Sequence, residues 1–191
     1  NPEIISCQIS AWGGTKGGKY KEDPSFDPVL QAASGIMTRY GSAKKPVLHG
    51  IASCVDYMTG FLAVTGILQA LVARKRGFGG SFVRTSLAMG AQLVQFPFML
   101  SHSSFKPGSE PSGQSSIGHG LGQQLYKLAD GWAYLGCRPE DEANLASLLG
   151  ASECTVDAIS SVVRDVRFEK IRSQIKELRG ASLMRPESLA T

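Results

Sequence analysis

The feature that most constrains this chain is an apolar run over residues 56–76, DYMTGFLAVTGILQALVARKR. Its apolar side chains recur at helical spacing and cover most of the circumference, which predicts a long helix buried nearly all round. The uncharged part, 57–73, contains Gln69 and is shorter than the roughly 20 apolar residues of a membrane span. We therefore expect a core helix and no membrane partner.

The rest of the chain alternates short strand and helix patterns, which indicates an α/β fold. A stretch rich in Ser, Gly and Pro, 101–118, predicts a linker. The domains expected on its two sides are 1–105 and 106–191, with the last residues, LMRPESLAT, frayed or truncated. We expect strands over 4–10 and 81–86, a hairpin with its turn at Asp130–Gly131, and helices over 27–39, 56–76, 87–100 (bent near Pro97), 140–149 and 156–179.

Composition excludes several classes of function. The net charge of +4 is mild and no long run of Lys or Arg occurs, so nucleic-acid binding is not expected. The four cysteines form no C-x-x-C pair and the three histidines are widely separated, so no metal site is expected. The opening Asn1-Pro2-Glu3 is polar and resembles no signal peptide, which predicts a cytoplasmic protein with reduced thiols, with organellar targeting left open.

Asp56 stands at the start of the long helix. One interpretation is an N-cap whose carboxylate accepts a backbone N–H. The other uses the same physics: a helix N-terminus stabilises an anion and lowers the pKa of a carboxylate. An ionised Asp56 held rigidly beside a cleft would then be a nucleophile. The residues alone leave both interpretations open.

Other patterns give weaker signals. Cys54 would be a nucleophile if a histidine acted as its base, but cysteine is more often a small buried hydrophobe. The run GGTKGGK around Lys16 lacks the spacing of a P-loop, which argues against binding of a nucleoside triphosphate. The alternating Gly118, Gly120 and Gly122 predict either a flexible loop or a lid whose backbone approaches a ligand closely.

Four stretches together resemble the class III CoA-transferases, the CaiB/BaiF-type family that includes carnitine CoA-transferase, formyl-CoA transferase and the alpha-methylacyl-CoA racemases. The stretches are NPEIISCQISAWG, SFDPVLQAASGIM, CVDYMTGFLAVTGILQALVARKRGFGGSFVRTSL and GHGLGQQLYKLADGWAYL, which lie between residues 1 and 150. The resemblance implies that 1–105 is the C-terminal portion of a Rossmann-like, CoA-binding large domain and that 106–191 contains a small α+β domain. It also implies an interlocked dimer.

The resemblance makes Asp56 the counterpart of the family's nucleophilic aspartate. It implies CoA transfer from an acyl-CoA to a carboxylic acid, through an aspartyl anhydride and an aspartyl-CoA thioester, with coenzyme A as a substrate and no permanently bound cofactor. Gly120, Gly122 and Gln123 match the glycine loop that covers the site. Asp27 matches an acidic position that assists in some transferases. The sequence Asp27-Pro28 also predicts a helix N-cap at Asp27, followed by proline at the first helical position.

The chain also departs from the family. The family's Ser-Gly-Phe-Gly is replaced by Ser10-Ala11-Trp12-Gly13. The racemase branch has a histidine where this chain has Phe26, which disfavours the alternative of an alpha-methylacyl-CoA racemase or epimerase. The resemblance also implies an N-terminal half that supplies most CoA contacts, which we expect to lie outside this sequence. A second alternative is therefore a non-catalytic fragment or partner subunit, with the missing half supplied by a homodimer or another chain.

Overall fold

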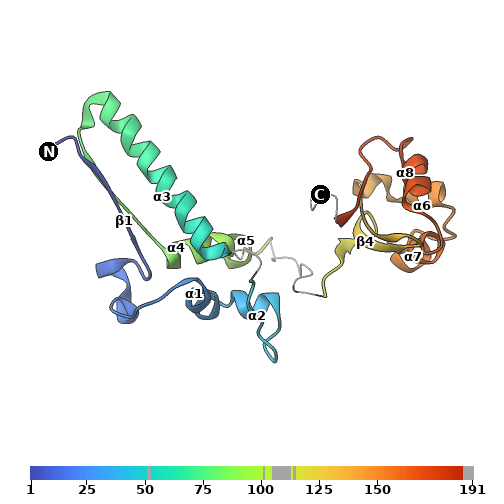
Figure 1. The fold of residues 1–191 in the computed structure, drawn as a ribbon, viewed down its shortest axis with the longest axis horizontal. Helices are drawn as coiled ribbons and strands as arrows, with labels where there is room; N and C mark the ends of the chain where they lie inside the picture. The colour runs from blue at the N-terminus through green and yellow to red at the C-terminus, as the bar shows by residue number, and fades with distance from the viewer. Residues whose placement is uncertain (51–52, 101, 105–112, 114, 187–191) are drawn as a thin grey trace. The chain divides into compact units, whose positions relative to one another are not determined.

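The computed structural model describes residues 1–50, 53–100, 102–104, 113 and 115–186. It divides the chain into two compact units, Asn1–Gln114 and Ser115–Thr191 (Figure 1). The division lies inside the predicted linker, after the boundary expected at 105–106, and most of that linker falls outside the described residues. Helices occur together with a parallel and an antiparallel sheet, which confirms the α/β class.

The first unit is built on a parallel pair of strands, β1 (Ile5–Ser10) and β2 (Ser81–Ser86). Parallel strands need a crossover connection, and helices supply it here. Figure 1 shows the longest of them, α3, running alongside the strand pair. The helices of this unit are α1 (Asp27–Ser34), α2 (Ile36–Tyr40) and α3 (Cys54–Ala73) before β2, and α4 (Leu87–Val94) and α5 (Phe96–Met99) after it; shorter turns are Gly14–Lys16, Gly18–Tyr20 and the π-helical Arg74–Phe78.

Two helices predicted as continuous are each divided. The helix expected over 27–39 breaks at Gly35, whose φ of 84° is a left-handed conformation that ends α1. The helix expected over 87–100 breaks at Gln95, and α5 then starts with a proline in its first turn. The long helix starts two residues earlier than expected, at Cys54.

Helix α3 is not buried nearly all round, and that expectation is wrong for this chain. Its buried residues form one stripe, whereas Phe61 on the other side is 69% exposed. The strand pair and α4 supply one covering layer among the described residues. By length and composition Cys54–Phe78 is apolar enough to cross a membrane, and 22% of its most apolar window is buried. The buried stripe is Val55, Thr59, Ala63 and Ala70, and the exposed apolar residues include Tyr57, Val64, Leu68 and Val72.

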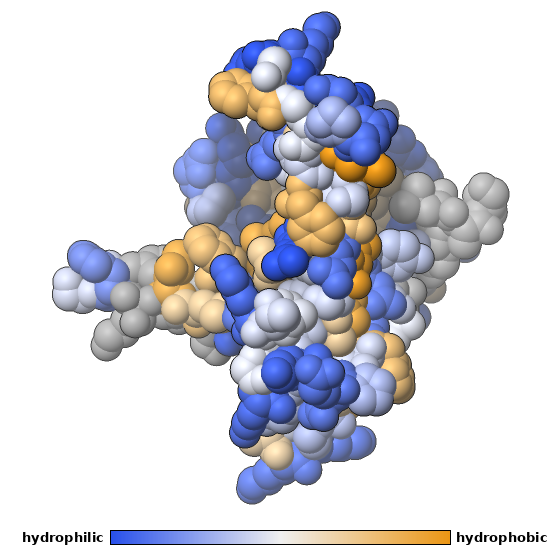
Figure 2. All heavy atoms as spheres, turned by 90° about the vertical axis from the view of Figure 1, so that its left-hand side faces the viewer, coloured by the Kyte–Doolittle hydropathy of each residue, from blue (hydrophilic) through white to orange (hydrophobic). Residues whose placement is uncertain are grey.

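Apolar side chains therefore remain at the surface of the first unit. In the space-filling view of Figure 2, hydrophobic side chains lie among hydrophilic ones on the face turned toward the viewer. The buried core of this unit is small and lies where α1, the first residue of α2, the start of α3 and α4 meet. It consists of Leu30, Ile36, Val55 and Ala91.

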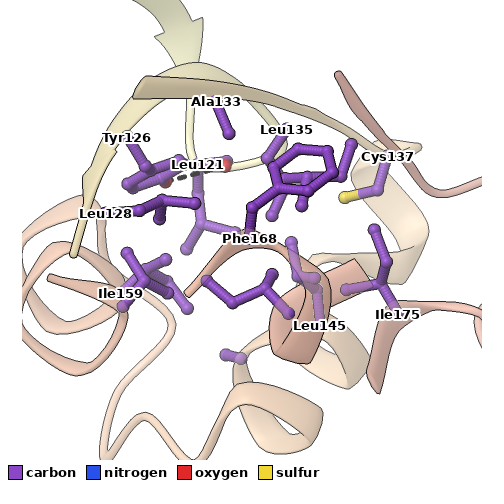
Figure 3. Close-up of a cluster of buried hydrophobic side chains, with 14 residues drawn as sticks. Leu121, Tyr126, Leu128, Ala133, Leu135, Cys137, Leu145, Ile159, Phe168 and Ile175 are labelled. Atoms are coloured by element: carbon purple, nitrogen blue, oxygen red, sulfur yellow. Dashed lines mark hydrogen bonds between the residues drawn. The ribbon is translucent and has the colours of Figure 1, made fainter. Parts of the chain in front are cut away.

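In its described residues, the second unit has a four-stranded antiparallel sheet in the order β3-β4-β5-β6, three α-helices and a 3-10 turn, Pro139–Asp141. In β4 and β5 buried and exposed residues largely alternate, which is typical of a sheet with one face on the core. Figure 3 shows that core, with Leu135, Phe168 and Ile175 among its side chains. The elements are β3 (Gly118–Gly120), β4 (Gln123–Leu128), β5 (Gly131–Gly136), α6 (Glu142–Leu149), α7 (Val156–Val163), α8 (Phe168–Ile175) and β6 (Ser182–Met184).

Three details of the second unit differ from expectation. The hairpin is present, but its turn residues are Ala129–Asp130, and Gly131 already belongs to β5. The helix predicted over 156–179 is two helices, because the chain between them bonds back to the hairpin turn: the Ala129 N–H donates to the Val166 carbonyl. The C-terminal stretch expected to fray supplies β6, while residues 187–191 lie outside the described part.

Candidate active site

Asp56 lies in the first turn of α3 with its side chain exposed. It is not the N-cap, because the helix begins at Cys54 and the cap position is Ser53. Within the described residues no hydrogen bond or ion pair reaches the Asp56 carboxylate. The structure therefore presents a carboxylate on a fixed helical turn with its oxygens available.

The capping role expected of Asp56 belongs to Asp27. The Oδ2 atom of Asp27 accepts hydrogen bonds from the backbone N–H groups of Val55 (2.8 Å) and Asp56 (3.0 Å). Asp27 was expected to cap its own helix, but the cap position of α1 is Phe26. A carboxylate on a helix N-terminus also interacts favourably with the helix dipole. Asp27 thus fixes the start of the helix that carries Asp56.

Asp27 is itself held in place. It is only 4% exposed, and its Oδ1 accepts a hydrogen bond from the side-chain amide of Gln31. Gln31 also bonds both backbone groups of His49, as donor to the carbonyl (3.1 Å) and acceptor from the N–H (3.0 Å). This network joins α1 to the segment that enters α3. Sequence reasoning missed Gln31, although an Asp and a Gln four residues apart on one helix face were a usable signal.

The pKa of Asp56 is shifted in the direction opposite to the one expected from the helix terminus. Desolvation by burial raises the pKa of the Asp56 carboxyl, and the negative charge of Asp27 raises it further. Asp27 accepts the N–H groups of Val55 and Asp56 and so places its own negative charge beside Asp56. Asp56 therefore sits beside a like charge, and a more basic carboxylate is a better nucleophile.

Cys54 is a poor candidate nucleophile. Burial raises the pKa of its thiol, and the charge of Asp27 adds to the shift, so the reactive thiolate is disfavoured. Of the histidines proposed as its base, His49 forms a T-shaped ring contact with Tyr40, with the ring centroids 4.7 Å apart, and His102 forms a hydrogen bond with Ser104. His119 belongs to the second unit, in β3.

Phe26 precedes Asp27 and is 63% exposed. Its backbone is extended, and its side chain offers no group that transfers a proton. The position that bears a histidine in the racemase branch is therefore occupied by an apolar, accessible ring.

The glycine loop lies in the second unit and is anchored behind its tip. The Tyr126 hydroxyl donates to the Leu121 carbonyl (2.8 Å), and burial raises the pKa of Tyr126 to about 12. The Gly122 N–H donates to Glu142 Oε1 (3.1 Å), and its carbonyl accepts from the N–H of Cys137 (2.6 Å). These bonds fix Leu121 and Gly122.

The two glycines of the predicted site differ in their surroundings. A Cβ at Gly122 would lie 2.6 Å from the sulfur of Cys137, so the fold itself requires glycine there. A Cβ on Gly120 would meet nothing within 4 Å, and its φ is not in the left-handed region. The unit therefore gives no steric reason for glycine at position 120. Gln123 follows at the start of β4, paired with Gly120 and exposed.

The structure thus brings together some of the predicted site residues. Asp27 and Asp56 are bonded through the backbone of α3, and Phe26 is next to Asp27 in the chain. Gly120, Gly122 and Gln123 are brought together within the second unit. Among the described residues no group of three or more His, Cys, Asp or Glu side chains is placed to hold a metal ion.

Solved structures identify the fold. One is a CaiB/BaiF family protein from Brucella suis, with a TM-score of 0.70 and 21% identity, covering 100% of this chain and 54% of that one. Another, a protein of Mycobacterium tuberculosis, has a TM-score of 0.73 and 17% identity, covering 100% and 56%. The chain therefore has the α/β fold of CaiB/BaiF proteins.

The sequence identifies the family. The family model described as CoA-transferase family III matches residues 1–184, and the chain belongs to that family. The CoA-transferase/lyase DddD of a Marinomonas species is 29% identical over 150 residues, covering 78% of this chain and 18% of that protein. The succinyl-CoA–L-malate CoA-transferase beta subunit of Chloroflexus aurantiacus is 27% identical over 175 residues, covering 90% and 41%. The chain thus spans less than half the length of these curated relatives.

Proposed function

We propose that the chain carries the nucleophile of a CoA-transferase that moves CoA from an acyl-CoA to a carboxylic acid, with Asp56 as that nucleophile. The observation that supports this most directly is the contrast between the two aspartates. Asp27 accepts hydrogen bonds from the backbone N–H groups at the start of α3, whereas the Asp56 carboxylate is exposed and unpaired among the described residues. Asp27 is then a positioning residue, although the family resemblance had suggested a catalytic one.

The first half-reaction transfers the acyl group and then CoA to the enzyme. An Asp56 oxygen attacks the thioester carbonyl carbon and the C–S bond breaks. CoA departs as the thiolate, and a mixed anhydride between Asp56 and the acyl group is formed. The thiolate attacks the Asp56 carboxyl carbon. The anhydride C–O bond breaks, the donor acid departs with one former Asp56 oxygen, and an aspartyl-CoA thioester remains. Each intermediate keeps an activated carbonyl, so water has to be excluded.

The second half-reaction reverses these steps with another acid. The acceptor carboxylate attacks the Asp56 carbonyl and expels CoA thiolate, which gives a second anhydride. The thiolate then attacks the acceptor's acyl carbon, and the products are the new acyl-CoA and the Asp56 carboxylate. One oxygen of that carboxylate now comes from the acceptor acid. We assign to Gly120 the close backbone approach that shields these intermediates, since no steric demand of the fold explains its missing side chain.

The alternatives differ in support. The second candidate is a non-catalytic fragment or partner subunit of such an enzyme, and its discriminating property is that the chain binds no CoA. A racemase or epimerase would need a proton-transferring group where Phe26 is found. We propose that a further polypeptide segment or a second chain supplies most of the CoA contacts and covers the exposed side of α3. We also propose that the protein is a dimer and that it is located in the cytoplasm.

Trapping of a covalent intermediate tests this function. The protein is incubated with a set of acyl-CoAs, treated with hydroxylamine, and measured by intact mass spectrometry beside Asp56→Asn and a matched control, Asp23→Asn, on an exposed loop residue. We expect a hydroxamate at Asp56 in the wild type and the control, and none in Asp56→Asn. No adduct with any acyl-CoA, and no CoA binding, would favour the non-catalytic alternative.

A further inference from the structure

A pocket of about 670 Å³ lies at the carboxyl ends of β1 and β2, and the site residues discussed above are not among those that line it. Both strands end in it, at Ser10 and Ser86, which are opposite each other in the register. The loop after β1 and the start of α4 form its other walls. In open α/β sheets, ligands bind in the crevice outside the carboxyl ends of parallel strands. The position is thus one where this class of fold places ligands.

The pocket has an excess of positive charge. Lys16, Lys21 and Arg84 line it, against one acidic residue, Glu22. Glu22 forms an ion pair with Lys21 at 3.8 Å, so the pocket has no further acidic residue to pair with Lys16 and Arg84. Within the described residues neither Lys16 nor Arg84 forms an ion pair, and the Arg84 guanidinium lies over the Phe82 ring at 4.7 Å. Stacking of this kind holds a guanidinium while leaving its N–H groups available for an anion.

One polar group at the pocket also has no partner. Trp12 lines it, and the Trp12 indole N–H is buried without a hydrogen bond in the described part of the chain. A buried donor without an acceptor is costly, so such groups are usually explained by water, an ion or a ligand. The backbone at Gly14, which also lines the pocket, has free space around it, since a Cβ on Gly14 would meet nothing within 4 Å.

The pocket adjoins the helix of the nucleophile. The Thr59 hydroxyl, one turn after Asp56 on α3, lies 3.4 Å from the carbonyl of Ser86 at the end of β2. Ser86 also caps α4, accepting from the Met89 N–H at 3.2 Å. An anion in the pocket would therefore be held by the same framework that holds the first turns of α3.

We propose that this pocket is an anion-binding subsite, formed chiefly by Arg84 and Lys16, for an oxyanion of a substrate that reacts at Asp56. The oxyanion is either a phosphate group of CoA or a second carboxylate on the acid. The identity of that substrate depends on the proposed function, whereas the binding of an anion does not. The GGTKGGK run, which does not fit a nucleoside triphosphate site, takes part in this different role through Lys16.

Calorimetric titration tests the proposal with two probes, inorganic pyrophosphate for the phosphate source and succinate, beside acetate, for the second carboxylate. The proteins are wild type, Arg84→Gln, Lys16→Gln, Asp56→Asn and a control, Arg172→Gln, which removes an exposed cation of the second unit. Loss of one charge-assisted hydrogen bond predicts about tenfold weaker binding in each pocket variant. Circular dichroism checks that each variant is folded.

If pyrophosphate binding is weakened in Arg84→Gln and Lys16→Gln, the oxyanion in the pocket is a phosphate group of CoA. If succinate binding is weakened in these variants, the oxyanion is the second carboxylate of the acid. We expect unchanged binding in Arg172→Gln. If neither probe binds, or if both folded pocket variants bind like the wild type, the subsite does not exist. Anion binding that persists where no Asp56 adduct forms would overturn the proposed function and leave the subsite standing.

Discussion

The Oδ2 atom of Asp27 lies 3.0 Å from the backbone nitrogen of Asp56 and accepts its N–H. Two carboxylates 29 residues apart in the chain thus have different roles at one helix end. Asp27 is buried and bonded, and it uses the positive end of α3. Asp56 is exposed and keeps its oxygens available, with its pKa raised by partial burial and by the charge of Asp27.

Asp27→Asn should shift the pH dependence of adduct formation. Asp56 must be ionised to attack, so the rate falls as the pH drops through its pKa. The charge of Asp27 is one of the causes that raise this pKa, so its removal should move the acidic limb to lower pH. The measurement is the rate of trapped adduct from pH 3 to 7, beside Asp23→Asn. An unchanged limb in a folded Asp27→Asn protein would show that Asp27 does not act on Asp56 through its charge.

Asp27→Ala should be more damaging than Asp27→Asn. It leaves the N–H groups of Val55 and Asp56 without their acceptor, which predicts a loss of about 3 kcal/mol in the free energy of unfolding. Asparagine retains one oxygen for these donors and should cost about 1 kcal/mol. Urea unfolding followed by circular dichroism checks the order. Equal stability of Asp27→Ala and the wild type would contradict the capping role.

Asp56→Asn should make the first unit slightly more stable while it abolishes the adduct. The raised pKa means that the ionised form is disfavoured by the fold, so the native state gains from losing this charge at neutral pH. Because the side chain is exposed, the gain should be below about 1 kcal/mol. Thermal unfolding at pH 7 and at pH 3 measures it: the difference should shrink at pH 3, where Asp56 becomes protonated.

Gly122→Ala and Gly120→Ala form a matched pair. The first places a methyl group 2.6 Å from the Cys137 sulfur and should cost about 1–3 kcal/mol of stability. The second meets open space and should change stability by less than about 1 kcal/mol. If Gly120 approaches the reacting groups, Gly120→Ala should nevertheless lower the rate of CoA transfer. Full activity in Gly120→Ala would show that the loop tip does not cover the site.

Asp130 should make the second unit sensitive to acid. The Phe168 N–H (3.0 Å) and then the Arg185 guanidinium (2.6 Å) hold the pKa of Asp130 below its usual 3.8. The stability that comes from these bonds is present above the ordinary pKa and is lost as the pH falls through the lowered one. Asp130→Asn should therefore flatten the decline of stability below about pH 4, whereas Asp165→Asn, at an exposed position, should not.

Local patterns predicted the elements that local chemistry controls. The alternation in 123–137 predicted the hairpin, and the apolar run after Cys54 predicted the long helix. The break before Phe168 was not predictable, because it depends on hydrogen bonds to Ala129 and Asp130 from a distant part of the sequence. The helical pattern continues through it, so tertiary contacts decided the outcome.

The site was predictable only in part, because its hydrogen bonds also join residues that are distant in the sequence. The resemblance singled out Asp56 and Asp27, but the residues suggested that each capped its own helix. The bonds from Val55 and Asp56 to Asp27 cross 28 and 29 positions, and no local pattern reveals them. The exposure of one side of α3 was also hidden, because hydropathy records which residues need cover and not whether the chain supplies it.

The most direct test of the central claim follows the oxygen atoms of Asp56. The protein turns over an acyl-CoA with an acceptor acid labelled with heavy oxygen, and the tryptic peptide that carries Asp56 is analysed by mass spectrometry. Attack by the Asp56 carboxylate predicts that heavy oxygen from the acceptor accumulates in that side chain and in no other. Turnover that leaves the Asp56 peptide unlabelled would contradict the nucleophilic role.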